Sequence, residues 1–526
     1  MNTNEKLSPA RVSGFLQAKG REIVNGKGEP IILSGWGLGN WLLCEGYMWK
    51  AGPMGDRPRK LEQVVRELAG SRYAEGFWPR FRENYVRRED ILRMAELGYN
   101  SVRVPIGWRV LMEDEPGIHW KEEGFRLLDR LLDWCQEAGI YAFLDLHGAP
   151  GGQTGANIDD CVDDFPRLFT DRDSWDKALA LWGELARRYR DRWIVGGYDL
   201  LNEPLRPDDG RRPCQYLLPR LRDFYIEAIA EIHRHDQKHM LSIEGGSWAT
   251  DPSVFCMDYD SNMVIHFHRY AVMPDIGAYR EFLELSERWD KPLWLGESGE
   301  NTPEWFAALY PLGAKLGVGY NVWPWKKMDC ENSPYSVNMP KGWEKFTAYT
   351  CGGERPSYEE AQAMLEEYLD NMLIENCREN PAVSASVRRE PGCSVRATDF
   401  DQNGCLGSCR TDGVSGYRRG SGMKILEPEA MPEKRFGFDC RWDAFKLSLS
   451  PGEYAEYTFF AAKEGSGVSV EFCEGSGGQA EVFQDGRSLG KVSPGEGPLP
   501  LRPAAETVIR VAGSSGECLL ERIVFE

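Results

Sequence analysis

Residues 141–147 read YAFLDLH, a short run that is apolar at nearly every position and ends in a histidine. Such a run is typical of a parallel strand that is covered on both faces. Similar runs recur along the chain, and the predicted strands are Ile31–Gly37, Ser101–Pro105, Tyr141–His147, Tyr198–Asn202, Met240–Glu244, Met263–His268, Leu293–Glu297 and Gly319–Trp323.

Helical patterns lie between these strands. One apolar face recurs at helical spacing in Leu221, Phe224, Tyr225, Ala228, Ile229 and Ile232. Thr302-Pro303 predicts a helix start, and the capping box Ser357-x-x-Glu360 predicts a last helix that runs to about Leu373. Strands that are each followed by a helix predict an α/β fold, a closed (β/α)₈ TIM barrel.

The pattern changes after residue 375. Residues 376–393 have no apolar periodicity and are predicted to be a linker. Residues 394–526 contain alternating segments such as EYAEYTFFA and TVIRVA between turn residues. Short alternating strands of this kind predict an all-β sandwich, jelly-roll-like in type. The predicted domains are therefore a barrel in residues 1–375, a linker and a C-terminal sandwich.

Composition narrows the partners without selecting a function. The formal net charge of −19 argues against nucleic acid, because like charges would have to approach one another. No long apolar run predicts a membrane span, and the first 24 residues have basic side chains but no apolar core of a secretory signal. The 14 cysteines have no repeating spacing, which favours free thiols. We expect a cytoplasmic location, unless a signal has been removed; protein partners remain unknown.

Polar side chains close the apolar runs. In a barrel of this type the strands end at the face that carries function. The residues at these ends are Arg103, His147, Asn202, Glu203, His268, Glu297 and Trp323. They combine two carboxylates with imidazole, guanidinium and indole groups, which is a set suited to binding and cleaving a sugar acetal.

Cleavage of an acetal needs a carboxylic acid that protonates the departing oxygen and a carboxylate that meets the oxocarbenium-like carbon. The fourth and seventh strands of a barrel can hold two carboxyl groups ~5–5.5 Å apart, the separation of retaining enzymes. Two carboxyl groups this close do not both ionise readily, so one keeps its proton as the acid. Arg103 beside Glu297 would keep Glu297 ionised, which leaves Glu203 as the acid.

These residues lie in motifs that resemble glycoside hydrolase family 5, in clan A. YDLLNEP (198–204) resembles its strand-4 signature, LWLGESG (293–299) its nucleophile motif, SVRVPIGW (101–108) its arginine strand and HFHRY (266–270) its His-x-Tyr. Three longer stretches resemble the branch of exo-β-1,3-glucanases and β-glucosidases: GWGLGNWLLCEG (35–46), FLDLHGAPGGQTGANIDD (143–160) and NVWPWKKMD (321–329).

The resemblance implies roles by position. Glu203 would be the acid/base and Glu297 the nucleophile, the latter held by Arg103 and Tyr270. Four more residues would contact the sugar: Asn202 at its 2-hydroxyl, His147 and His268 beside it, and Trp323 beneath it as a stacking platform. Glu45 and Trp108 would close an exo-type pocket. His266 would then point into the barrel wall, and Glu244, an acid at the end of strand 5, would be a decoy.

The implied function is release of terminal β-linked glucose from oligosaccharides or β-glucosides through a covalent glycosyl-enzyme. The substrate partner is a carbohydrate or glycoside, and catalysis needs no cofactor. No His-x-x-x-His or Cys/His cluster predicts a metal site. Two alternatives stay open: an endo-acting β-glucanase or β-mannanase with an open cleft, and a non-catalytic sugar-binding protein.

The C-terminal segment resembles family 6 carbohydrate-binding modules, from VRATDFD (395–401) to LLERIVFE (519–526). The resemblance implies a structural calcium near Asp399 and Asp401. Leu519 and Glu521 stand where the family presents asparagine to a sugar, which leaves Tyr417 and Trp442 as aromatic platform candidates. A sandwich that only supports the barrel is the alternative.

Overall fold

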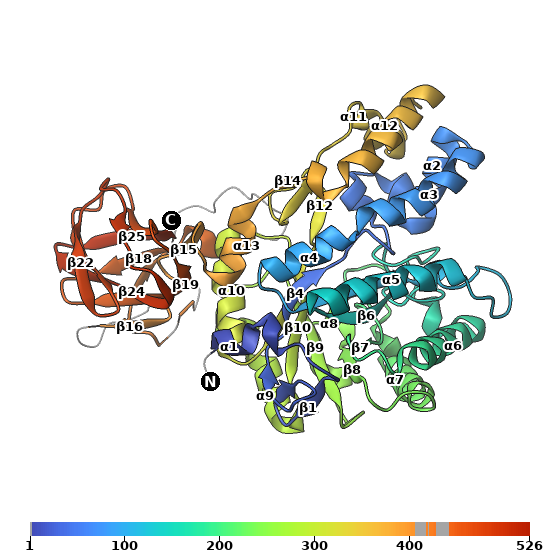
Figure 1. Ribbon diagram of the computed structural model, residues 1–526, viewed down its shortest axis with the longest axis horizontal. Helices are drawn as coiled ribbons and strands as arrows, with labels where there is room; N and C mark the ends of the chain where they lie inside the picture. The colour runs from blue at the N-terminus through green and yellow to red at the C-terminus, as the bar shows by residue number, and fades with distance from the viewer. Residues whose placement is uncertain (1–2, 406–416, 419, 428–440) are drawn as a thin grey trace. The chain divides into compact units, whose positions relative to one another are not determined.

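The computed structural model describes residues 3–405, 417–418, 420–427 and 441–526 (Figure 1). It divides into two compact units. The first comprises Met1–Arg269, Glu281–Ser298 and Leu316–Glu379, and the second comprises Tyr270–Arg280, Gly299–Lys315 and Asn380–Glu526. None of the described helices is long and apolar enough to cross a bilayer.

The first unit contains a closed barrel of parallel strands. The strands in chain order are β4 (Ser34–Gly37), β5 (Ser101–Gly107), β6 (Tyr141–Gly148), β7 (Val195–Asp199), β8 (Met240–Glu244), β9 (Met263–Arg269), β10 (Leu293–Gly299) and β11 (Gly319–Trp323), and β11 pairs with β4 to close the ring. The predicted TIM barrel is confirmed.

Helices alternate with the strands (Figure 1). The described helices of eight or more residues before residue 375 are α2 (Pro58–Ala69), α3 (Ser71–Tyr85), α4 (Arg88–Glu96), α5 (Glu122–Ala138), α6 (Arg172–Tyr189), α7 (Leu218–His233), α9 (Arg280–Trp289), α10 (Pro303–Lys315), α11 (Trp343–Thr350) and α12 (Tyr358–Asn371). Both predicted helix starts are confirmed: the Thr302 hydroxyl accepts from the backbone N–H of Trp305, and the capping box at Ser357 is complete.

The fourth barrel strand differs from its prediction. It runs from Val195 to Asp199 rather than from Tyr198 to Asn202, so Asn202 lies in the loop beyond the strand. The start was hidden by Gly196-Gly197, which weakens a strand pattern in sequence. A Cβ at either glycine would come within 2.6 or 2.8 Å of the Phe143 ring, so the two glycines make room for that ring.

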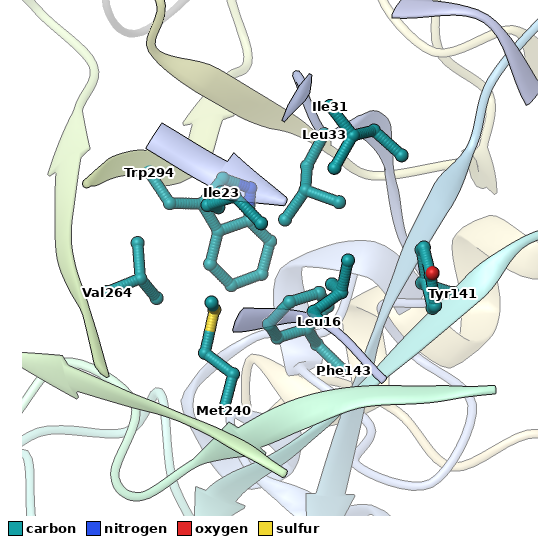
Figure 2. Close-up of a cluster of buried hydrophobic side chains, with 9 residues drawn as sticks. All are labelled: Leu16, Ile23, Ile31, Leu33, Tyr141, Phe143, Met240, Val264 and Trp294. Carbon is teal, nitrogen blue, oxygen red and sulfur yellow. The ribbon is translucent and has the colours of Figure 1, made fainter. Parts of the chain in front are cut away.

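An N-terminal hairpin lies against the amino-terminal ends of the barrel strands. Strands β1 (Gln17–Lys19), β2 (Glu22–Val24) and β3 (Pro30–Ile31) form a small sheet. Figure 2 shows the buried cluster that joins this segment to the barrel, which consists of Leu16, Ile23, Ile31, Leu33, Tyr141, Phe143, Met240, Val264 and Trp294. This apolar cluster lies at the end of the barrel away from the predicted site.

The second unit contains two antiparallel sheets. One has the order β17-β18-β25-β20-β23, with β15 also on β25, and the other has the order β16-β19-β24-β21-β22. The strands are β15 (Cys393–Arg396), β16 (Gln402–Gly404), β17 (Lys424–Leu426), β18 (Lys446–Leu449), β19 (Tyr454–Ala462), β20 (Gly467–Phe472), β21 (Gln479–Gln484), β22 (Arg487–Val492), β23 (Leu499–Pro500), β24 (Ala504–Ser515) and β25 (Cys518–Phe525). Phe459 and Phe525, with ring centroids 4.9 Å apart, join the sheets, and the predicted all-β fold is confirmed.

The segment predicted to be a linker is ordered. It contains β14 (Arg378–Glu379) and helix α13 (Pro381–Arg388), whose Val383 and Val387 are buried. Its apolar residues are too few for a periodic signal in sequence. The predicted boundaries of the three domains stay a prediction.

Two expectations for the second unit do not fit the structure. Tyr417 and Trp442 are each only 1% exposed, so neither ring offers a platform to a sugar. Both donate hydrogen bonds to Asp399, and the carboxylate of Asp401 accepts from Arg389 at 2.6 Å. The Arg389 guanidinium therefore supplies the positive charge beside Asp401, and these two carboxylates do not fit a calcium site.

Candidate active site

The carboxyl ends of the barrel strands bring most of the predicted residues together. Strands β5, β6, β9, β10 and β11 supply Arg103, His147, His268, Glu297 and Trp323, while Asn202 and Glu203 follow β7. All seven lie in the first unit. The contacts below link them into one network, as the strand ends predict.

Arg103 is the centre of the network. Its side chain is fully buried, and its guanidinium donates to Glu297 at 2.5 Å and to the Asn202 amide oxygen at 2.8 Å. It also donates to Asp199 at 2.8 Å and to Glu244 at 2.9 Å. A single cation therefore holds the nucleophile candidate and organises the neighbouring acids, which a planar guanidinium can do through several donors at once.

The two catalytic candidates lie close to each other. One carboxylate oxygen of Glu203, one of Glu297 and a ring nitrogen of His268 all lie within 4.8 Å of one another. The side chains are 13% and 7% exposed, so both reach solvent at the barrel mouth. Retaining glycosidases hold their carboxyl groups ~5–5.5 Å apart and inverting ones ~6.5–9.5 Å apart, so this geometry is that of the retaining class.

Glu203 is positioned to carry a proton. Burial raises its pKa to about 7; the His268 hydrogen bond opposes the shift and the negative charge of Glu297 adds to it. The Glu203 backbone has a positive φ of 44°, and its N–H donates to the carboxylate of Glu244 at 2.7 Å. A left-handed non-glycine backbone is uncommon and needs such support. Glu244 therefore holds the acid candidate in place and is more than a decoy.

His147 is held as a neutral ring. Burial lowers its pKa to about 4, and Nδ1 lies 2.7 Å from a carboxylate oxygen of Asp145. Its ring stacks on Trp323 with an interplanar angle of 3° and centroids 5.3 Å apart. Asn202 lies on its other side, 3.3 Å from Nε2. The ring is thus fixed at both nitrogens and on one face.

Trp323 lies at the mouth with a defined orientation. Its indole N–H donates to the Tyr47 hydroxyl at 2.8 Å. A Cβ on Gly37 or Gly39 would come within 2.7 Å of the indole, so these glycines allow the ring to approach the backbone. Tyr47, which is 44% exposed, was not predicted, because nothing in the sequence separates it from an ordinary loop tyrosine.

Sequence reasoning missed the acids and the histidine below the strand ends. Asp145 and Asp199 are buried carboxylates that contact Arg103. The expectation that His266 points into the barrel wall is wrong: its Nδ1 lies 3.2 Å from Asp199 and 2.9 Å from Ser242, inside the barrel. Residues two apart on a strand share a face, so the inward position of His268 already implied this.

Three predicted residues have less defined places. Tyr270 follows β9 and belongs to the second unit, so its role beside Glu297 stays a prediction. Glu45 is buried where a 3₁₀ turn begins after β4. Trp108 is buried after β5, with the Lys177 ammonium 5.7 Å from its ring centroid. Their part in closing a pocket also stays a prediction.

Two groups of side chains have the spacing of metal ligands. They are Glu244 with His266 and His268, and Glu203 with His268 and Glu297. One carboxylate oxygen of Glu244 and one of Glu297 already accept a hydrogen bond from the Arg103 guanidinium, at 2.9 and 2.5 Å. The arrangement favours acid/base and nucleophilic roles for these carboxyl groups over the binding of a metal ion.

The chain is similar to several known proteins. The profile of Cellulase (glycosyl hydrolase family 5) matches residues 67–311. A β-xylosidase of Phanerodontia chrysosporium is 34% identical over 46% of this chain, which spans about half (48%) of that protein's length. A solved structure of endogalactoceramidase aligns with 97% of this chain and 99% of its own, at 16% identity and a TM-score of 0.47.

A second relative is matched over more of its length. A glucan 1,3-β-glucosidase of Candida oleophila is 31% identical over 353 residues, which cover 58% of this chain and 73% of that protein. The barrel, the paired carboxyl groups, the family profile and this relative agree. The chain belongs to glycosyl hydrolase family 5.

Proposed function

We propose that the chain is a retaining exo-β-glycosidase that releases terminal β-linked glucose from oligosaccharides or β-glucosides. Glu203 is the acid/base and Glu297 the nucleophile. The observation that carries the proposal is that oxygens of the two carboxyl groups lie within 4.8 Å of each other. The two groups differ in their partners, because Arg103 contacts Glu297 and not Glu203. Hydrolysis by this family needs no cofactor, because two carboxyl groups and water supply the chemistry.

The first step forms a covalent intermediate. The Glu297 carboxylate attacks the anomeric carbon while Glu203 transfers its proton to the departing glycosidic oxygen. Arg103 keeps Glu297 ionised before the attack, since a guanidinium contact favours the charged form of a carboxyl group. The aglycone leaves as an alcohol, and the sugar stays bound to Glu297 as an ester.

The second step returns the enzyme to its starting state. Glu203, now a carboxylate, removes a proton from water, and the water oxygen attacks the anomeric carbon as the bond to Glu297 breaks. Two inversions give a product of the original configuration. His268, whose Nδ1 lies 2.8 Å from Glu203, stabilises the carboxylate between the steps when it donates an N–H.

Substrate recognition is proposed for the residues around this pair. Asn202 lies beside both Arg103 and His147, and its amide would bind the 2-hydroxyl of the sugar. Trp323, which is 4% exposed, would stack beneath the sugar through its indole ring. Glu45 and Trp108 would close one end of the site, which favours a terminal sugar over an internal one.

A panel of aryl β-glycosides tests the activity directly. Hydrolysis of the β-glucoside with the β-anomer as first product, followed by NMR, is the expected result. First release of the α-anomer would contradict the retaining mechanism. No turnover of any aryl β-glycoside would favour a non-catalytic sugar-binding protein.

The same panel addresses the sugar and the mode of attack. The β-xylosidase relative supports xylose as a second candidate, because xylose differs from glucose only by lacking the hydroxymethyl group. Mixed oligosaccharides before any glucose, in a time course on a β-glucan, would favour an endo-acting enzyme over an exo-acting one.

We also propose a reducing, cytoplasmic location. The described cysteines are free thiols, which supports a compartment where disulfides do not persist. Cell fractionation with an antibody against the chain tests the location, and recovery from the culture medium would contradict it.

A further inference from the structure

A continuous chain of polar contacts joins the two carboxyl groups through the barrel interior. Nδ1 of His268 lies 2.8 Å from a carboxylate oxygen of Glu203. Nε2 of the same ring lies 3.0 Å from Nε2 of His266. Nδ1 of His266 lies 3.2 Å from a carboxylate oxygen of Asp199. Asp199 accepts a hydrogen bond from Arg103, which also donates one to Glu297. His266 is the central member of this chain and has no role in the steps above.

The hydrogen bond between the His266 and His268 rings has one donor and one acceptor, and the site depends on which ring donates. Two nitrogens 3.0 Å apart require one N–H donor and one lone pair. If His266 donates, His268 accepts at Nε2, and its remaining hydrogen at Nδ1 points to Glu203. If a neutral His268 donates instead, its Nδ1 is an acceptor and attracts the Glu203 proton away from the substrate.

The charges around His266 favour the first direction. Four polar groups surround the ring: Asp199, Ser242, Glu244 at 3.4 Å and His268. The Trp294 ring packs against it at 4.7 Å. Burial raises the pKa of Asp145 well above its usual range and that of Glu244 to about 8, which favours the neutral form of both groups. Arg103 alone does not balance the other two carboxylates, Asp199 and Glu297, and a net charge in a buried cluster is costly. A second cation at His266 balances it.

We propose that His266 is a positioning residue: as the second buried cation, it donates to Asp199 and to His268, so that His268 Nδ1–H donates to one oxygen of Glu203. The transferable proton of Glu203 then lies on its other oxygen. During the first step this proton passes to the glycosidic oxygen, and the His268 N–H stabilises the carboxylate left behind. His266 keeps its proton throughout. The inference rests on the proposed role of Glu203.

Leaving-group dependence tests this role, because an activated aglycone departs without protonation. For His266→Phe we expect kcat/KM on an alkyl β-glucoside to fall by about 10²-fold, within the range of general acid catalysis. On 2,4-dinitrophenyl β-glucoside the fall should stay below about threefold. His266→Gln keeps an N–H donor and should recover at least about tenfold on the alkyl substrate.

The pH profile gives a second readout. Loss of the His268 donor removes stabilisation of the Glu203 carboxylate, so the basic limb should move to higher pH in His266→Phe and remain in place in His266→Gln. Equal losses on both substrates, or equal behaviour of the two variants, would overturn the proposal. Full activity of Glu203→Gln on the alkyl glucoside would instead refute the proposed function.

A measurement on the unmodified protein covers the case in which a variant does not fold. In histidine-labelled protein, ¹⁵N NMR should find His266 protonated at both nitrogens and His268 protonated at Nδ1 only. A His268 ring protonated at Nε2 would overturn the proposal.

Discussion

Arg103 is the residue on which the site depends for its charge balance. It is fully buried and contacts four carboxylates, two of which are Asp145 and Asp199. Removal of one partner from a buried ionic cluster leaves uncompensated charge. The catalytic assignment therefore has a stability consequence that can be measured apart from activity.

For Arg103→Met we expect the free energy of unfolding to fall by about 3–5 kcal/mol. Urea unfolding followed by circular dichroism measures it. Arg130→Met is the control, because this arginine is 40% exposed and its ion pair with Glu83 spans 3.9 Å. The control should change stability by no more than about 0.5 kcal/mol, and an equally small effect at Arg103 would contradict the network.

Glu203 predicts the pH dependence of activity. Its pKa is raised to about 7, so the proton needed for the first step is present below pH 7 and is lost as the pH rises through that value. We expect kcat/KM on a substrate with a poor leaving group to fall about tenfold for each pH unit above 7. A basic limb near pH 4.5 would mean that Glu203 is ionised in the free enzyme.

The sequence predicted the residues at the strand ends but not the layer below them. Arg103, Glu203 and Glu297 were identified because polar residues that close apolar runs stand out. Asp199 and His266 lie inside apolar-looking strands, where one polar residue resembles a core residue with a satisfied hydrogen bond. Only the closure of the barrel brings them to the same point.

At the scale of the element, strand β10 contains an irregularity that serves the site. The register between β10 and β9 shifts between Leu295 and Glu297, at Gly296. A Cβ on Gly296 would lie 2.0 Å from Nε2 of His266. Bulges next to active sites re-aim side chains, and here the bulge precedes the nucleophile candidate.

Gly296→Ala should therefore displace His266 and lower the free energy of unfolding by about 1–3 kcal/mol, with a loss of kcat/KM. Gly76→Ala is the matched control, because a Cβ there, in helix α3, would meet nothing within 4 Å. Alanine in a helix is favoured over glycine, so the control should be neutral or more stable by up to about 1 kcal/mol. A fully active and stable Gly296→Ala would contradict the close packing.

A substitution in the N-terminal hairpin should lower the free energy of unfolding without lowering kcat/KM. Ile23 is 5% exposed in the cluster of Figure 2. Tyr141 and Met240 of this cluster are the first residues of β6 and β8, so the cluster lies opposite the strand ends that carry the site. Ile23→Ala should cost about 2–5 kcal/mol in unfolding free energy while kcat/KM stays within about twofold. Chemical denaturation and steady-state kinetics on one preparation test both parts, and a matching loss of kcat/KM in the folded variant would contradict the separation.

At the scale of the whole molecule, the two fold types were predictable and the division between them was not. Strand patterns of period two identify the C-terminal sheets. The second unit also includes 270–280 and 299–315, which lie between barrel strands in sequence. Grouping of this kind depends on contacts between distant residues, such as Arg389 with the carbonyl of Ala307, which no local pattern reveals.

Removal of metal ions tests whether the second unit contains a calcium site. Because Arg389 occupies the place beside Asp401, we expect EDTA to leave the melting temperature unchanged. Differential scanning calorimetry with and without added calcium measures this. A fall in the melting temperature that calcium reverses would indicate that a calcium site exists after all.

The central claim is that Glu297 forms a bond to the sugar while Glu203 supplies the proton. Incubation with a 2-deoxy-2-fluoro-β-glucosyl fluoride, followed by peptide mass spectrometry, tests it most directly. The account predicts time-dependent inactivation with one label on the peptide that contains Glu297. Label on another acid, such as Glu244, or inactivation without a covalent adduct, would contradict it.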